Sequence, residues 1–247
     1  VNLQIIYEDD DIVAVDKPSG ILAHGHANSG EEKTVADWVR EKYPETENVG
    51  EPFKLNNGET IKRPGIVHRL DKETSGVLLV AKTKEGFEHL KKQFQNREIE
   101  KIYRTFVWGN FSKPTGIINK SIGRSASDFR KKSAEKGRTG IEREAITEYK
   151  VLNQNKEHAY LEVQPKTGRT HQIRAHLKSI GRPVVCDFLY ASKKPPALDF
   201  KRLALHAFSI TFKNLKGDTV MAEAPLPTDF VEAEKQLKNK PHPAPSP

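Results

Sequence analysis

Residues 68–83 read HRLDKETSGVLLVAKT, and this stretch sets the pattern for the whole chain. A polar turn around Asp71 leads directly into the apolar run Val77–Ala81, which predicts a short buried strand. Thr83 follows that run at an N-cap position, and apolar residues then recur at helical spacing as far as Phe94. The stretch therefore predicts a strand and a helix, with a polar turn in front of them.

The segment around Tyr103 is the clearest second strand. Residues 99–108 alternate with period two, so Tyr103 shares one face with Ile99 and Val107. Other apolar runs that border polar turns predict further strands over 12–15, 145–152, 159–163, 203–212 and 219–223.

Two more helices are predicted from their start signals. Thr34 is placed as an N-cap with Asp37 at the capping-box position, and Thr170 opens a helix that Gly181 closes. Many strands and two or three helices favour an α+β fold built on a mixed, largely antiparallel sheet. We expect one domain over 1–235 and a proline-rich tail over 236–247.

Composition narrows the classes of function. Among 247 residues, 41 Lys and Arg against 33 Asp and Glu leave a net charge of +8, which attracts polyanions such as nucleic acid. Cys186 is the single cysteine, so no internal disulfide can form and a reducing, cytoplasmic setting is expected. No apolar run is long enough for a membrane span, and collagen, coiled-coil and disulfide-scaffold classes are excluded.

Half of the net charge is concentrated in the segment 124–139. Its acids are Asp128 and Glu135, and its basic residues are Arg124, Arg130, Lys131, Lys132, Lys136 and Arg138. The segment has no apolar periodicity. It is either a solvated loop or a mobile arm that closes on phosphates.

Standard cofactor motifs are missing. The chain has neither a phosphate-binding GxxxxGK[ST] loop nor GxGxxG, and His24 and His26 have no cysteine or carboxylate cluster beside them, so we predict no nucleotide cofactor and no metal. An SxxK motif at Ser133 and a KTG motif at Lys166 resemble those of penicillin-binding acyl-enzymes. Too few residues separate them for the helical domain such enzymes place between them.

Two concentrations of polar residues could carry chemistry. Arg69 and Lys72 flank Asp71 and could keep its carboxylate ionised as a nucleophile or base. An ordinary exposed, charged turn would show the same residue pattern. His171 and Arg174 lie along one stripe of the predicted helix and could hold a phosphate or the Asp71 carboxylate, or form an ordinary surface stripe.

For two further positions, the residues alone leave the role undecided. Arg169 immediately precedes the helix and could join that basic stripe. Tyr103 is either a core residue or an aromatic platform for a nucleobase.

Taken together, HRLDKETSG, KIYRTFVWG, GRTHQIRAHL and LALHAFSITF resemble the motifs of the RluA-type RNA pseudouridine synthases, in family order. The opening IYEDDDIVAVDKPSG resembles their first motif, and the likeness runs from about residue 5 to 230. It implies a pseudouridine synthase fold in two halves around a catalytic cleft. It also implies isomerisation of uridine in RNA without cofactor or metal.

The resemblance assigns four residues. Asp71 matches the essential aspartate, which either attacks C1′ or removes the 2′ proton. Tyr103 matches the tyrosine that stacks on the flipped base, and Arg174 the arginine that pairs with the catalytic carboxylate. Arg69 matches the arginine that enters the RNA stack where the base has left.

The substrate is expected to be structured RNA, either 23S-type ribosomal RNA or transfer RNA, bound by a monomer. Many relatives carry an N-terminal RNA-binding module of the S4 type, and this sequence shows none. We expect either a short form, in which the basic segment could replace the module, or a chain trimmed before Val1. The expected RNA-binding residues are Arg124, Arg130, Lys131, Lys132, Arg169 and His171. The alternative is a catalytically silent RNA-binding or ribosome-assembly factor on the same fold.

Overall fold

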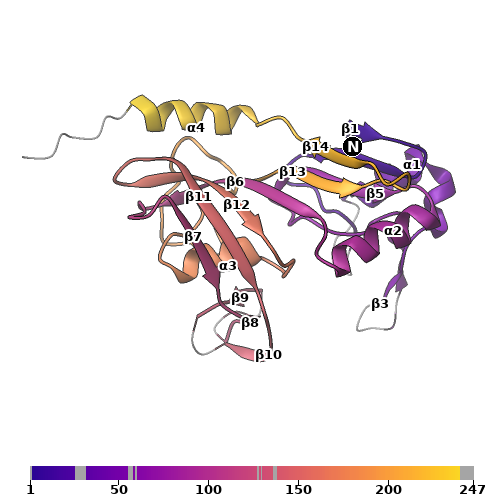
Figure 1. Cartoon of the computed structure of the whole chain (residues 1–247). Helices are drawn as coiled ribbons and strands as arrows, with labels where there is room; N and C mark the ends of the chain where they lie inside the picture. Colours follow the sequence, from indigo (N-terminus) through magenta and orange to yellow (C-terminus); the bar gives the residue numbers. More distant parts are fainter. Residues whose placement is uncertain are drawn as a thin grey trace, which may run out of the picture. The chain divides into compact units, whose positions relative to one another are not determined.

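A computed structural model describes residues 2–25, 32–54, 58, 60–126, 128, 130–135 and 138–239. The chain divides into two units, one formed by residues 1–100 and 207–225 and the other by 101–206 and 226–247. Both combine strands with helices, which confirms the α+β class (Figure 1). Within the described ranges, no helix is both long and apolar enough to cross a lipid bilayer.

The first unit is a sheet with helices packed on it. Its strands follow one another across the sheet in the order β1 (Gln4–Glu8), β2 (Ile12–Lys17), β5 (Ser75–Ala81), β13 (Leu205–Lys213) and β14 (Thr219–Glu223). The β1–β2, β2–β5 and β13–β14 pairs are antiparallel. All seven residues of β5 are buried, as its apolar run predicts.

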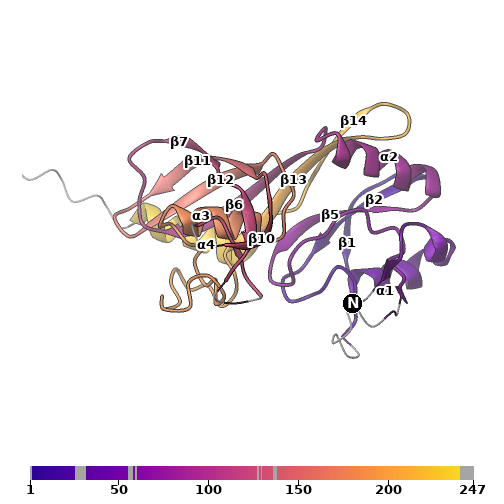
Figure 2. The same ribbon diagram turned by 90° about the horizontal axis from the view of Figure 1, so that it is seen from below.

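Two α-helices belong to this unit, and both begin where their caps predict. In α1 (Val35–Lys42), Thr34 and Asp37 form the complete capping box. In α2 (Lys84–Gln95), the Thr83 side chain accepts from Gly86 N, and the helix packs against β5 (Figure 2). The remaining short elements are a 3-10 helix at Pro44–Asn48 and the strand pair β3 (Phe53–Lys54) and β4 (Thr60–Ile61).

The second unit contains an antiparallel sheet. Its strands are ordered β6 (Glu100–Trp108), β12 (His158–Pro165), β11 (Ile146–Gln154) and β7 (Thr115–Asn119). Figure 1 shows α3 (Gln172–Ser179) on one face of these strands and α4 (Thr228–Asn239) on the other. Phe106 and Phe230 lie in the shared core, with ring centroids 5.5 Å apart.

Three observations in this unit differ from the sequence expectations. Parts of the segment 124–139, expected to be a solvated loop or a mobile arm, join a small sheet of β8 (Ile122–Arg124), β9 (Lys132–Ser133) and β10 (Thr139–Arg143). The third helix begins at Gln172 rather than Thr170, because His171 has a left-handed backbone (φ 54°) at the N-cap. Helix α4 includes residues 236–239, so the expected tail starts no earlier than 240, and 240–247 lie outside the described residues.

Candidate active site

Asp71 lies at the start of a tight turn that leads into β5. The backbone N–H of Thr74 donates to the Asp71 carbonyl at 3.1 Å and closes the turn. Asp71 is half-buried, whereas Arg69 is exposed. This arrangement leaves a carboxylate partly shielded from water, on a backbone that the following buried strand holds in place.

A fully buried lysine anchors this turn. The ammonium of Lys17, at the end of β2, donates to the carbonyls of Pro18 at 3.0 Å, Ile21 at 2.8 Å and Lys72 at 3.1 Å. A lysine ammonium has three N–H donors, so these bonds satisfy all of them and offset the burial of the charge. Sequence reasoning did not single out Lys17, because the partner that ties it to the Asp71 turn, the Lys72 carbonyl, lies 55 residues away in the sequence.

Two further bonds fasten the same turn to the residues after β2. The N–H of Gly20 donates to the Lys72 carbonyl at 2.8 Å, and the Ser19 hydroxyl donates to the Glu73 carbonyl at 2.6 Å. Together with the Lys17 bond, they hold the two residues that directly follow Asp71. The carboxylate is therefore carried by a turn with little freedom to move.

Gly76 fixes the position of the strand that follows. Its φ is +109°, and a Cβ atom added there would lie 2.1 Å from the carbonyl oxygen of Ala207 on β13. Only glycine permits so close an approach at this backbone angle. Because Gly76 comes five residues after Asp71, this contact also sets where the turn begins.

The charges around the turn differ in part from expectation. The ion pair of Lys72 is with Glu32 rather than with Asp71. Its ammonium lies 2.7 Å from a carboxylate oxygen of Glu32. Burial lowers the pKa of Arg63, and the like charge of Arg69 lowers it further. Arg63 and Arg69 thus place two guanidinium groups in the same neighbourhood of this unit.

In the second unit, Tyr103 occupies the expected strand. It is opposite Val163 of β12 and packs partly buried against the core of the unit. Lys101 precedes it by two residues and so shares its face of β6. Burial lowers the pKa of Lys101 to about 8, an ionisable group that the sequence analysis did not select.

Arg174 on α3 is held by a carboxylate that the sequence did not suggest. Its Nε and Nη2 donate to the two oxygens of Asp187 at 2.8 and 2.9 Å, and both side chains are buried. The backbone N–H groups of Leu189 and Tyr190 donate to Oδ1 of Asp187 at 3.1 and 3.0 Å. The pairing of Arg174 with Asp71 stays a prediction, and Asp187 occupies the Nε edge of the guanidinium.

A chain of buried hydrogen bonds positions α3 itself. Gln172 donates to the Thr147 hydroxyl at 3.0 Å, and that hydroxyl lies 2.8 Å from Nδ1 of His176. Nε2 of His176 lies 2.9 Å from the Lys120 carbonyl, which can only accept, so Nε2 carries the proton. Burial lowers the pKa of His176, which keeps the imidazole neutral in this chain of bonds.

The remaining predicted RNA-binding residues separate into three groups. Arg130 and Lys131 lie 2.9 and 3.8 Å from the same carboxylate of Asp128, which offsets one of their two charges. His171 caps α3 and has its Nδ1 3.1 Å from the Tyr190 hydroxyl. The others line one cavity of the second unit: Arg124, Lys132 and Arg169. His26, considered as a metal ligand, lies outside the described residues.

Comparison with known proteins identifies the family. Residues 11–179 match the family model described as RNA pseudouridylate synthase. An uncharacterized RNA pseudouridine synthase from Bacillus subtilis is 36% identical over 96% of this chain and 74% of its own length. Ribosomal large subunit pseudouridine synthase D from Pseudomonas aeruginosa is 34% identical over 94% of this chain and 70% of its own length.

Solved structures agree on the fold. The human RNA pseudouridylate synthase domain containing 4 superposes with a TM-score of 0.71 at 25% identity, covering 95% of this chain and 92% of its own. Human RNA pseudouridylate synthase domain containing 1 gives 0.69 at 22% identity, covering 98% and 97%. With the family match, which includes the Asp71 turn, Tyr103 and Arg174, these findings show that the chain belongs to the RNA pseudouridylate synthase family, is of its RluA type, and is an isomerase that forms pseudouridine in RNA.

Proposed function

We propose that this chain modifies uridines in large-subunit ribosomal RNA, with Asp71 as the group that acts on the target nucleotide. The substrate is inferred from relatives in Pseudomonas aeruginosa and Neisseria meningitidis, both of which are named ribosomal large subunit pseudouridine synthase D. The net charge of +8 suits a polyanionic partner. Transfer RNA is the alternative substrate.

The reaction needs no second reactant. The N1–C1′ bond of uridine breaks, the uracil turns, and a C5–C1′ bond forms. The proton on C5 then leaves and N1, freed from C1′, takes up a proton, so the product is an isomer of the substrate. Asp71 either attacks C1′ or removes the 2′ proton, and either role needs an ionised carboxylate held still beside the sugar.

The observation that carries this proposal is the anchoring of the Asp71 turn. Lys17, Gly20 and Ser19 all bond to the carbonyls of the two residues after Asp71. A charge that reacts with a bound sugar gains rate from being fixed before the substrate arrives. An ordinary exposed turn has no need of a fully buried lysine beneath it.

Three other residues take supporting roles in the proposal. The ring of Tyr103 stacks on the uracil after it leaves the RNA helix, because a base inside a stem is out of reach. Arg174 is proposed to pair with the catalytic carboxylate, as the family resemblance implies, while Asp187 holds its Nε and Nη2 edge. The exposed side chain of Arg69 enters the gap in the base stack.

Replacing the carboxylate tests the proposal. We expect Asp71→Asn to form no measurable pseudouridine in large-subunit ribosomal RNA, with RNA affinity within about tenfold of wild type, because the change removes chemistry rather than binding. Glu73→Gln is the matched control, since it removes an exposed carboxylate from the same turn. Turnover by Asp71→Asn would contradict the role of Asp71. A wild-type protein that binds this RNA but modifies no uridine would instead favour an assembly factor.

A further inference from the structure

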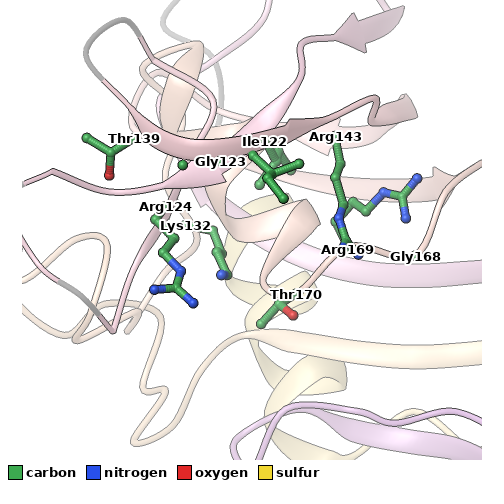
Figure 3. A pocket seen from close by; sticks show the side chains of 11 residues that line it. Ile122, Gly123, Arg124, Lys132, Thr139, Arg143, Gly168, Arg169 and Thr170 are labelled. Atoms are coloured by element: carbon green, nitrogen blue, oxygen red, sulfur yellow. The ribbon is translucent and has the colours of Figure 1, made fainter.

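The second unit contains a strongly basic cavity of about 620 Å³ (Figure 3). It is lined by the small sheet of β8, β9 and β10 and by the loop before α3. Figure 3 shows Arg124 and Lys132 on one side of the cavity and Arg143 and Arg169 on the other. Two hydroxyl groups, of Thr139 and Thr170, complete its polar lining, and no described lining residue is acidic.

The cations of this cavity have no carboxylate partners within the described part of the chain. Arg169 donates from Nε to the carbonyl of Glu144 at 3.1 Å, which fixes its direction without neutralising it. Other cations of the same region are matched: Arg130 by Asp128, and Arg138 by Glu142. The region thus places its uncompensated charge on the cavity side.

Four like charges gathered around one space repel each other, and an anion in that space would relieve the repulsion. Small-molecule pockets of similar size are lined mainly by apolar and aromatic side chains. Here the apolar lining is limited to Ile122 and Ile141, and no aromatic ring is present to stack on a base. Arginine, lysine and hydroxyl groups are instead the groups that bind phosphate oxygens.

The cavity also adjoins the strand that carries Tyr103. Gly168 lines the cavity, and a Cβ atom added there would lie 3.9 Å from Nζ of Lys101. Lys101 is on the same face of β6 as Tyr103, two residues away. A chain of phosphates bound in the cavity would therefore continue toward the face of β6 on which Tyr103 stands.

We propose that this cavity binds backbone phosphates of the substrate RNA, next to the segment that presents the target uridine. The inference rests on the proposed function for the identity of the RNA. It adds Arg143 to the interface, a residue outside the segment that drew attention in the sequence. It also makes Arg130 and Lys131 secondary contacts, because the pair shares the carboxylate of Asp128, which offsets one of its two charges.

The test compares two double variants that each remove two positive charges, one pair from the cavity and one pair from outside it. Lys132→Gln with Arg143→Gln alters the cavity, and Arg130→Gln with Lys131→Gln is the control. Binding of a labelled oligouridylate is measured over a range of salt concentrations. We expect the cavity variant to bind at least about tenfold more weakly and to flatten the log–log salt slope by about 1.4, since each single-strand phosphate contact contributes about 0.7. The control should stay within about threefold, and equal losses in both variants would overturn the proposal.

A single position gives a second test that leaves the fold intact. Thr139 is exposed, so Thr139→Glu adds a carboxylate to the cavity without disturbing the core, and Thr139→Gln is its uncharged control. We expect RNA affinity to fall only for Thr139→Glu. Equal affinity in the two variants would overturn the proposal, as would polyglutamate that competes as well as RNA of equal charge.

Pseudouridine formation at saturating RNA separates this proposal from the function on which it rests. The cavity variants should need at least about tenfold more RNA than wild type to reach half of the saturated single-turnover rate, because the cavity binds RNA but does not react. Loss of that rate with unchanged affinity would overturn the phosphate assignment. A wild-type protein without activity, whose cavity variants still lose the salt slope, would contradict the proposed function and leave the cavity assignment standing.

Discussion

Arg174 and Asp187 form a buried, two-bond ion pair thirteen residues apart in the sequence. Nε and Nη2 of the arginine lie 2.8 and 2.9 Å from the two carboxylate oxygens, and the guanidinium stands 5.1 Å from the ring centre of Tyr190. Two backbone N–H groups also bind Asp187, so the carboxylate is fixed independently of the arginine. The pair holds the guanidinium in one orientation before any substrate binds.

Removing the charge of Asp187 should be costly. We expect Asp187→Asn to lower the free energy of unfolding by about 3–5 kcal/mol, because it removes the negative charge from a buried, two-bond ion pair with Arg174. Urea unfolding measures the loss. Glu135→Gln is the control, because it breaks the exposed pair that Lys178 of the same helix makes, which is worth about 0–1 kcal/mol. A similar loss in both variants would mean that the buried Arg174–Asp187 pair contributes no more to the free energy of unfolding than the exposed pair.

The hydroxyl of Tyr103 can be separated from its ring. We expect Tyr103→Phe to keep RNA affinity, because stacking needs only the ring, and to slow turnover about 10²-fold or more if the hydroxyl moves a proton. Tyr103→Leu should weaken binding as well. Single-turnover kinetics with a separate binding assay distinguish the two. Full activity of Tyr103→Phe would show that the hydroxyl takes no part in the chemistry.

Lys17 should matter to both stability and rate. Lys17→Met removes the shared donor of three carbonyls, so we expect a loss of at least about 1–3 kcal/mol in the free energy of unfolding. Because the Asp71 turn loses one of its anchors, kcat should fall more than stability alone explains. Lys33→Met, which removes an exposed lysine paired with Glu41, is the control for both measurements. A folded Lys17→Met protein with wild-type kcat would contradict the anchoring role.

Gly76 offers a separation of steric contact from backbone strain. Gly76→Ala should destabilise the protein by at least about 2 kcal/mol, because the new methyl group meets the Ala207 carbonyl and φ is positive. Gly217 also has a positive φ, +88°, but open space where a Cβ would lie. Gly217→Ala therefore reports the strain alone. Equal thermal shifts for the two variants would rule out the close approach between β5 and β13 at this point.

His176 predicts a pH dependence of stability. Its pKa is lowered by burial, so below about pH 6.5 the unfolded state takes up a proton before the folded state does. The stabilisation is complete above that pH and is lost as the pH falls, at up to about 1.4 kcal/mol per pH unit. Urea unfolding of wild type and His176→Gln across this range measures the difference. Parallel pH profiles would show that His176 titrates alike in both states.

Local structure was predictable wherever its cause lies within a few residues. The capping box of Thr34 and Asp37 and the N-cap at Thr83 depend on bonds inside one helical turn, and both are present. The alternation around Tyr103 likewise depends only on which side of a strand each residue faces, and β6 follows it. The α4 helix was missed, although Phe230, Ala233 and Leu237 recur at helical spacing and are buried.

The basic segment shows where local reasoning stops. Its composition resembled a solvated loop, because strands of two to five residues have too little length for a period to appear. Pairing between β8 and both of its neighbours creates order that no single strand encodes. Lys131, which shares Asp128 with Arg130, and Lys132, which lines the cavity, are adjacent in the sequence and identical in type.

The order of residues by itself determined the class of fold, the strand and helix around Asp71, and the motifs that mark the family, since these depend on neighbours in the chain. Only the folded molecule decided that Asp187 pairs with Arg174 and that Lys17 bonds to the Asp71 turn. It also decided that Arg143 and Lys132 line the same cavity. Each of these relationships joins residues from separate strands, helices or loops. Burial and long-range pairing set them, and neither leaves a period that can be read along the chain.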